Sequence, residues 1–349
     1  MTNQRTPLRI GVLGAGGLGK AAATIIGMKR QLRLCAICDS KGFVASSEWV
    51  DVRAVAASGS DLVEGYRRAE ADGSLGGRAA ASTATVTAEH CADPIGAVLE
   101  RAGELDGILI ALPNLPNEFI PGVIERAARA GYSLVFTDVL KRTRAVRRMF
   151  ELDELVKASR SVVLTGCGAT PGMLAAAAVL AAQSFIDVER VDIWWGVGIA
   201  NWDAYKATIR EDIAHLPGYN VERAKAMTDG EVDALLDRTD GVLELRHMEH
   251  ADDVLLERAG VVDRLEQVEV GGVMDTRRPR KPVSTTMTLT GITFDGKRSS
   301  HRFILGDETT MAANVIGPAL GYLARGLWLK SRGLFGVFGS TDVMPMVVR

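Results

Sequence analysis

The sequence predicts an α/β fold in two parts, an N-terminal Rossmann domain and an α+β second domain with a mixed or antiparallel sheet. The first observation is the glycine-rich turn Gly14-Ala15-Gly16-Gly17-Leu18-Gly19, which lies between the apolar run 8–13 and an Ala-rich helical pattern over 20–29. The second is the repeated succession of apolar run, loop and helical pattern, which is typical of parallel βαβ units. The third is a change after residue 188 to runs that alternate with period two, as antiparallel strands do.

The glycine-rich turn has the spacing of a dinucleotide cradle. Gly14 permits the tight turn, Gly16 lets backbone N–H groups approach a pyrophosphate, and Gly19 allows the helix to pack closely on the strand. Asp39 ends the next apolar run, where such folds place a carboxylate that binds the ribose hydroxyls of the adenosine. We therefore expect NAD or NADP as cofactor, bound by Gly14, Gly16, Gly17, Leu18, Gly19 and Asp39.

The residues that follow Asp39 leave the choice between the two cofactors open. The carboxylate favours NAD because it repels a 2′-phosphate. Ser40 and Lys41 are able to hold that phosphate and therefore favour NADP.

Two further strand ends are expected near the nicotinamide, because ligands of doubly wound folds collect at the carboxyl ends of the strands. The buried run 105–112 ends in Leu112-Pro113-Asn114, which also suits a plain entry loop for the helix over 118–130. The run 133–138 ends in Asp138, and Lys141 follows three residues later. Lys141 is the first candidate for proton transfer or for binding a substrate carboxylate, and an exposed lysine at a helix entry is the alternative.

Two other residues complete the catalytic candidates. Asp138 is placed to orient Lys141, or else to cap the helical pattern over 142–159. His215 ends the helical pattern over 204–215, where the helix dipole alone explains a histidine. His247 and His250 have metal-site spacing, but no companion ligands stand nearby, and we expect both on the surface.

A second glycine-rich turn, residues 166–172, joins the strand 161–165 to the Ala-rich helix 173–182. Such a turn places backbone N–H groups at a helix N-terminus, where an anion can bind, or it simply packs two domains together. We expect Cys167 and Gly168 to contact the cofactor and place a domain boundary here. The domains predicted are 1–165, a Rossmann domain; 166–308, for substrate and dimerisation; and 309–349, a C-terminal helical segment.

The second domain shows less regular patterns. Strands are expected over 191–198, 242–246, 268–273, 283–294 and 302–305, and a helix over 222–237. One face of the resulting sheet is free to pair with another subunit, so a homodimer is expected. The helix over 309–329 contains Gly317-Pro318, which should kink it or split it in two.

Composition excludes several classes of function. With 41 basic and 43 acidic residues the formal net charge is −2, which gives no electrostatic support for nucleic-acid or membrane binding. No signal peptide or membrane span is predicted, so we expect a cytoplasmic protein. The four cysteines do not form a disulfide framework in a chain of 349 residues, and Cys35 and Cys38 are expected to be core thiols.

The two glycine-rich turns together resemble those of the saccharopine dehydrogenase-like family and of diaminopimelate dehydrogenase. The similarity extends to Trp195-Gly196-Val197-Gly198 and to a final helix that returns to the cofactor domain. The resemblance implies NAD(P)-dependent hydride transfer at a C–N bond of a small amino or keto acid. Thr170 departs from the pattern, because relatives commonly carry Asp before the Pro-Gly pair, and the usual carboxylate near the substrate amine is therefore missing.

That departure keeps two other functions open. One is an NAD(P)-dependent reductase of a C=O or C=C bond. The other is a protein that binds a dinucleotide or a partner without catalysis, since none of the proton-transfer candidates is compelling from the sequence.

Overall fold

The computed structural model describes residues 6–76, 85–113, 115–199, 206–306 and 310–349. Asn114, a cofactor-binding candidate, lies outside the described residues. The chain divides into two compact units, and each is described by itself. Unit 1 comprises residues 1–140, 144–172 and 312–349, and unit 2 comprises residues 141–143 and 173–311.

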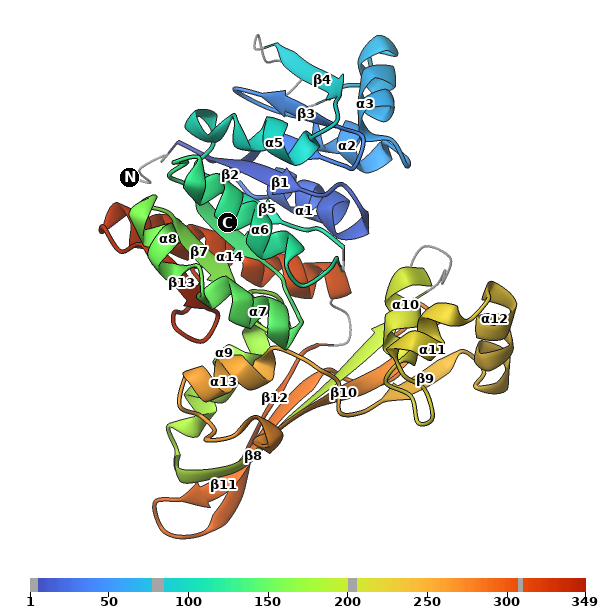
Figure 1. Ribbon diagram of the computed structural model, residues 1–349, viewed down its shortest axis with the longest axis vertical. Helices are drawn as coiled ribbons and strands as arrows, with labels where there is room; N and C mark the ends of the chain where they lie inside the picture. The colour runs from blue at the N-terminus through green and yellow to red at the C-terminus, as the bar shows by residue number, and fades with distance from the viewer. Residues whose placement is uncertain (1–5, 77–84, 114, 200–205, 307–309) are drawn as a thin grey trace. The chain divides into compact units, whose positions relative to one another are not determined.

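Unit 1 is built on a sheet of eight strands within the described residues, in the order β13-β7-β6-β5-β1-β2-β3-β4 (Figure 1). Neighbouring strands from β13 to β2 run parallel, and β3 and β4 continue the sheet as antiparallel strands. The strands are β1 Leu8–Leu13, β2 Leu32–Cys38, β3 Gly42–Ser46, β4 Val86–His90, β5 Gly107–Ile110, β6 Val135–Asp138, β7 Val162–Thr165 and β13 Gly336–Gly339. This order places the switch in winding direction between β1 and β5, where doubly wound folds bind their ligands.

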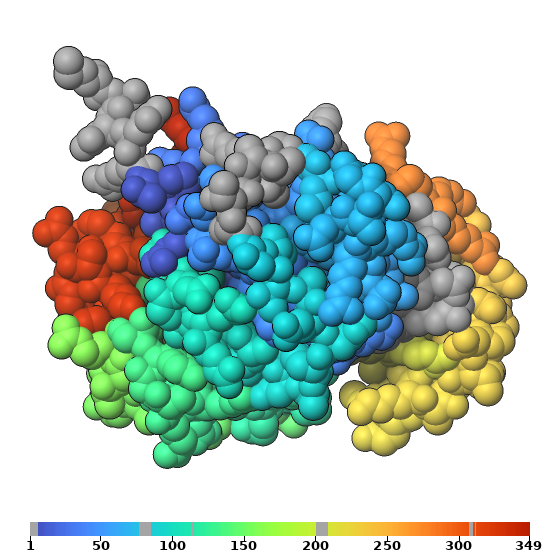
Figure 2. Space-filling model, turned by 90° about the horizontal axis from the view of Figure 1, so that it is seen from above, coloured from blue at the N-terminus to red at the C-terminus, as the bar shows by residue number. Residues whose placement is uncertain are grey.

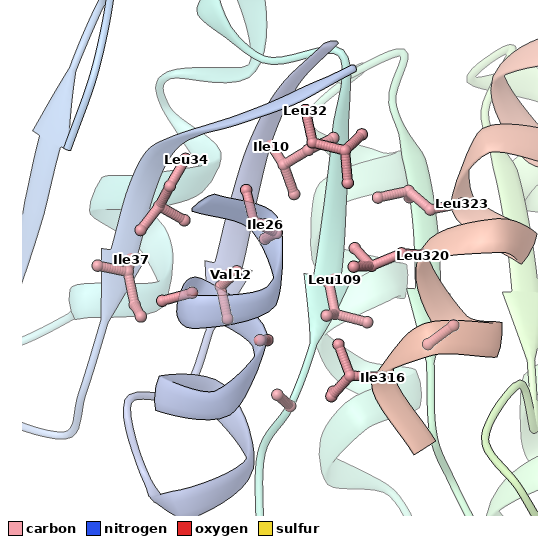
Figure 3. Close-up of a cluster of buried hydrophobic side chains, with 14 of the residues drawn as sticks. Ile10, Val12, Ile26, Leu32, Leu34, Ile37, Leu109, Ile316, Leu320 and Leu323 are labelled. Atoms are coloured by element: carbon pink, nitrogen blue, oxygen red, sulfur yellow. The ribbon is translucent and has the colours of Figure 1, made fainter. Parts of the chain in front are cut away.

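Helices cover both faces of this sheet because its strands are apolar on both sides. On β5, Leu109 faces one core, whereas Ile108 and Ile110 face the other. Figure 3 shows the first core, in which α1 and α14 lie on the strands. The helices on that face are α1 Gly17–Met28, α2 Val52–Ala57, α3 Leu62–Ala71 and α14 Met311–Ser331. Those on the other face are α5 Pro94–Leu99, α6 Phe119–Arg129, α7 Thr143–Phe150 and α8 Asp153–Ala158.

Unit 2 is a mixed sheet with helices. The strand order is β12-β11-β8-β10-β9, in which β8 and β10 are parallel and the other neighbours are antiparallel. The strands are β8 Phe185–Gly198, β9 Val242–Leu245, β10 Val268–Asp275, β11 Thr286–Thr293 and β12 Arg298–Ile304. The helices are α9 Met173–Ala182, α10 Lys206–Ile213, α11 Val221–Ala226, α12 Asp229–Arg238 and α13 Asp252–Arg258. Together the two units confirm the predicted fold class.

Several predicted elements are wrong in extent. The helices expected over 142–159 and 222–237 are each two helices, α7 with α8 and α11 with α12. Strand β3 was not predicted. Pro318 lies inside α14, which continues through it and is not split in two. Strand β13 and helix α13 were not predicted.

No helix in the described parts of the chain is both long enough and apolar enough to cross a membrane.

Candidate functional site

The first glycine-rich turn has the geometry that a dinucleotide cradle needs. Gly14 has φ +104°, and a Cβ on it would lie 2.5 Å from the carbonyl oxygen of Ala111, so only glycine fits. A Cβ on Gly19 would lie 1.8 Å from the carbonyl oxygen of Gly14, which shows how closely α1 packs on the turn. A Cβ on Gly16 would meet nothing within 4 Å, so the backbone there faces open space. This is the space that a pyrophosphate would fill.

The N-terminus of α1 is open to an anion. Gly16 is its N-cap and provides no side-chain hydrogen bond, and the first turn holds no acidic residue. Gly17 is exposed and Leu18 is half-buried. The free N–H groups and the helix dipole both favour a bound phosphate at this position. The residues present therefore fit the pyrophosphate of NAD or NADP.

Asp39 lies at the carboxyl end of β2 and is held by backbone donors. Its Oδ1 accepts hydrogen bonds from the N–H groups of Lys41 at 2.8 Å and Gly42 at 2.9 Å. Its Oδ2 accepts from Leu62 N at 2.9 Å. Each carboxylate oxygen has more than one lone pair, so Oδ2 is still able to accept a ribose hydroxyl. Ser40, next in the chain, is exposed.

The carboxyl end of β5 contacts the cradle. A Cβ on Gly14 would lie 3.3 Å from the backbone nitrogen of Leu112. Leu112 is half-buried and Pro113 is exposed. Leu112 therefore lines the turn that follows β1.

Asp138 ties the end of β6 to the turn after β7. It is 1 % exposed, and its Oδ1 accepts from Leu140 N, Gly166 N and Thr165 Oγ1 at 2.9 to 3.1 Å. Its Oδ2 is buried and makes no hydrogen bond within the described residues. Burial raises the pKa of this carboxyl group to about 6. The contacts make Asp138 an anchor for the backbone on either side of the strand end.

Cys167 and Gly168, predicted to contact the cofactor, are both buried in the turn after β7. The Cys167 N–H donates to the carbonyl oxygen of Asp138 at 3.0 Å, and burial raises the pKa of its thiol well above the usual range. The thiol is therefore a core group, and only the backbone of this turn is suited to meet a ligand. Cys35 and Cys38 are also buried free thiols, as predicted.

Lys141 and His215 come together in unit 2 around a carboxylate, Asp212. The Nζ of Lys141 lies 3.6 Å from Oδ1 of Asp212, whose side chain is 3 % exposed. That distance is an ion pair but is too long for a hydrogen bond, and Oδ1 has no hydrogen bond to any described residue. Burial raises the pKa of Asp212 although Lys141 opposes the shift, and burial lowers the pKa of His215 against the charge of Asp212. Three titratable groups that shift one another's pKa therefore lie together, and such groups are often found at functional sites.

Asp212 was not among the predicted site residues, although the sequence carries a signal for it. Ile209 and Ile213 on α10 are completely buried. The helical period puts residue 212 on the face that these two share. A charged residue on an apolar helix face is either paired or functional.

His250 contradicts the expectation that it lies on the surface. It is 5 % exposed, and its Nδ1 lies 2.7 Å from Oδ2 of Asp252, which is completely buried. Between them, Ala251 N–H donates to the carbonyl oxygen of Lys141 at 2.7 Å. His247, by contrast, is exposed as expected. The buried pair therefore supports the loop that holds the backbone of Lys141.

Comparison with curated proteins shows the family. The chain is 42 % identical, over 97 % of its length and 99 % of the other, to a Haloferax mediterranei protein named (S)-8-amino-7-oxononanoate synthase BioU. The chain belongs to the BioU family. No model in a scan of protein families matches it.

Solved structures confirm the fold of this BioU family member. DAP dehydrogenase of C. glutamicum in complex with DAP has a TM-score of 0.53 at 15 % identity, over 97 % of this chain and 94 % of that one. An engineered D-amino acid dehydrogenase bound to NADP+ gives the same TM-score at 14 % identity, with the same coverage. The fold implied by the resemblance to diaminopimelate dehydrogenase is thus confirmed, while the sequence relationship is to BioU.

Proposed function

We propose that this protein is an NAD(P)-dependent enzyme that interconverts a ketone and an amine at C7 of (S)-8-amino-7-oxononanoate. The geometry of Gly14 to Gly19 and of Asp39 supports binding of the cofactor, and the name of the H. mediterranei relative supplies the compound. The compound named there carries a carboxylate, a ketone at C7 and an amine at C8. This proposal keeps the reaction class expected from the sequence, hydride transfer at a C–N bond of a keto or amino acid.

The reaction balances as a dehydrogenation. Oxidation of the 7,8-diamine by NAD(P)+ and water gives the amino ketone, ammonia, NAD(P)H and a proton, and the reverse is a reductive amination. When bound, the nicotinamide supplies the hydride or accepts it. The protein must then bind the carbonyl, handle the proton and hold the ammonium group at C8.

The single observation that carries this proposal is the Lys141–Asp212 pair. Lys141 lies three positions after Asp138 at the carboxyl end of β6, and its side chain is 26 % exposed, so it is accessible to a ligand. We assign it the protonation of the C7 oxygen or nitrogen. Asp212, buried and short of hydrogen bonds, is suited to accept one from an ammonium group. It supplies the carboxylate that Thr170 does not.

Two neighbours support the same assignment. Burial lowers the pKa of His215, which favours its neutral form beside Lys141 and Asp212. A neutral imidazole is able to accept the proton that the ammonia or amine releases. Asp138 is assigned the positioning of the chain that leads to Lys141, through its bond to Leu140 N.

The proposal is tested by incubating the purified protein with the amino ketone, ammonium and NADH or NADPH. Oxidation of the cofactor with formation of the 7,8-diamine is expected. Mass analysis of the protein after borohydride reduction distinguishes proton transfer by Lys141 from condensation of its amine with the ketone. If NADH and NADPH bind but neither is oxidised when the amino ketone is added, the non-catalytic alternative gains support. Reduction to an amino alcohol would instead support the C=O reductase.

We also propose that the protein is a homodimer through the sheet of unit 2. The residues of β12 are exposed along its whole length, and Phe303 and Ile304 are 39 % and 55 % exposed. An exposed edge with apolar side chains is a common site of pairing between subunits. Light scattering coupled to size exclusion should give twice the chain mass, and Ile304→Lys should shift it to the monomer.

A further inference from the structure

The ribose end of the cofactor cradle carries a cluster of charged side chains that the pyrophosphate site does not explain. Asp61 lies 3.2 Å from Nζ of Lys41 through its Oδ2, and 3.1 Å from Nε2 of His90 through its Oδ1. The three come from different segments of unit 1: the loop after β2, the start of α3 and the end of β4. The segment around α3 is part of the outer surface of unit 1, light blue in Figure 2.

This cluster adjoins Asp39. Leu62, the residue after Asp61, donates its N–H to Oδ2 of Asp39, and Lys41 N donates to Oδ1. Any ribose that binds Asp39 therefore brings its 2′-substituent next to Lys41 and Asp61. NAD carries an uncharged hydroxyl there, and NADP carries a phosphate.

Asp61 is held as an anion. It is the N-cap of α3, and its Oδ1 accepts from Glu64 N at 3.1 Å. That backbone hydrogen bond, then the contacts with His90 and Lys41, hold the pKa of Asp61 well below its usual range. The carboxylate is therefore charged at neutral pH.

We propose that Asp61 selects NAD over NADP, because it occupies the two basic side chains that a 2′-phosphate would need and adds a negative charge beside Asp39. The inference rests on the proposed cofactor site and names the residue that determines its specificity. Asp39 and Asp61 would both repel a 2′-phosphate. The charge of Lys41, which could attract the phosphate, is already paired with that of Asp61. A hydroxyl meets no such penalty.

The size of the effect follows from the exposure of the groups. The side chain of Asp61 is 24 % exposed and that of Lys41 is 50 % exposed. Solvent partly screens groups with this exposure, so the interaction energy between Asp61 and a 2′-phosphate lies between the values for two charges in water and two charges at a protein surface. This energy corresponds to about a tenfold change in the affinity for NADPH.

The substitution Asp61→Asn separates charge from structure, because asparagine caps a helix as well as aspartate does. Calorimetric titration of NADH and NADPH into the wild-type protein should show at least about tenfold tighter binding of NADH. In Asp61→Asn, NADPH should bind about tenfold more tightly than in the wild type, and NADH should change by less than about twofold. Adding Lys41→Met to Asp61→Asn should remove the gain for NADPH.

Asp93→Asn is the matched control. Asp93 is also an N-cap, of α5, and also pairs with a basic side chain, Arg126 at 2.5 Å. Its substitution should leave the ratio of the two affinities unchanged. A wild type that prefers NADPH, or a ratio that Asp61→Asn does not move, overturns the inference while the cofactor site stands. Binding of neither cofactor overturns both.

Discussion

The backbone N–H of Ala251 donates to the carbonyl oxygen of Lys141 at 2.7 Å, which joins the segment 141–143 to the start of α13. A second bond strengthens this connection, since Thr143 Oγ1 donates to Asp253 Oδ1 at 2.8 Å. Residues 141–143 accordingly group with unit 2, although the chain on both sides of them belongs to unit 1. Lys141 is therefore held by the same unit that provides Asp212 and His215.

The buried pair of His250 and Asp252 supports this connection, and His250→Leu should destabilise the protein. The substitution removes a 2.7 Å contact from a carboxylate that is completely buried, which typically costs about 3 kcal/mol. Denaturant unfolding measures the loss. Asp252→Asn keeps an oxygen for the imidazole and should cost less. Equal stability of His250→Leu and the wild type would show that the pair does not support the loop.

The glycines of the cradle should separate binding from folding. Gly16→Val places its side chain in open space, so the protein should fold and lose its affinity for NADH and NADPH. Gly19→Ala should instead destabilise the protein by about 3 kcal/mol or more, since its Cβ would overlap the backbone of Gly14. Thermal unfolding and calorimetric titration measure the two effects. Unchanged affinity in a folded Gly16→Val protein would contradict the cradle.

Asp138 should make stability depend on pH. Its folded pKa of about 6 lies above the ordinary 3.8, so between these values the folded state binds more protons than the unfolded state. The free energy of unfolding should therefore fall as pH rises from about 4 to about 6, by up to about 3 kcal/mol at 1.36 kcal/mol per pKa unit. Asp138→Asn keeps the acceptor at Oδ1 and should remove this fall. Parallel unfolding profiles of the two proteins over pH 4 to 7 would contradict the assignment.

Lys141→Met should remove catalysis and leave the cofactor site intact. Loss of a group that transfers a proton typically lowers kcat by about 10² to 10⁴. The affinity for NADH or NADPH should change little, because the glycine cradle and Asp39 belong to unit 1. Steady-state kinetics and titration give both values. Lys157→Met is the matched control, since Lys157 also pairs with carboxylates, Asp153 and Glu154, but at the surface, and it should retain full activity.

The cradle was predictable from the sequence because its requirements concern the backbone. Gly14 and Gly19 each occupy a place where a Cβ collides with a carbonyl oxygen, and such places recur at fixed spacing in this fold. The position of Asp39 was predictable because the second strand of such a fold ends at a typical distance along the chain from the glycine-rich turn. Strand β13, by contrast, has only four residues and pairs with β7 from far along the chain, so no local pattern marks it.

The cluster of Lys141, Asp212 and His215 was only partly predictable. Lys141 follows from the position of β6, but its partner Asp212 lies 71 residues later, and only its place on an apolar helix face distinguishes it. His250 lacks even that signal, and its burial depends on tertiary packing. The role of Asp61 is also non-local, since it brings together Lys41 and His90 from two other segments.

We propose that this protein transfers hydride to C7 of an amino ketone and that Lys141 supplies the proton. The most direct measurement follows the fluorescence of NADH or NADPH as (S)-8-amino-7-oxononanoate and ammonium are added to the wild-type protein and to Lys141→Met. We predict oxidation of the cofactor by the wild type, with the 7,8-diamine as product, and oxidation at least about 10²-fold slower by Lys141→Met. Equal oxidation by both proteins, or none by a wild type with bound cofactor, would contradict the account.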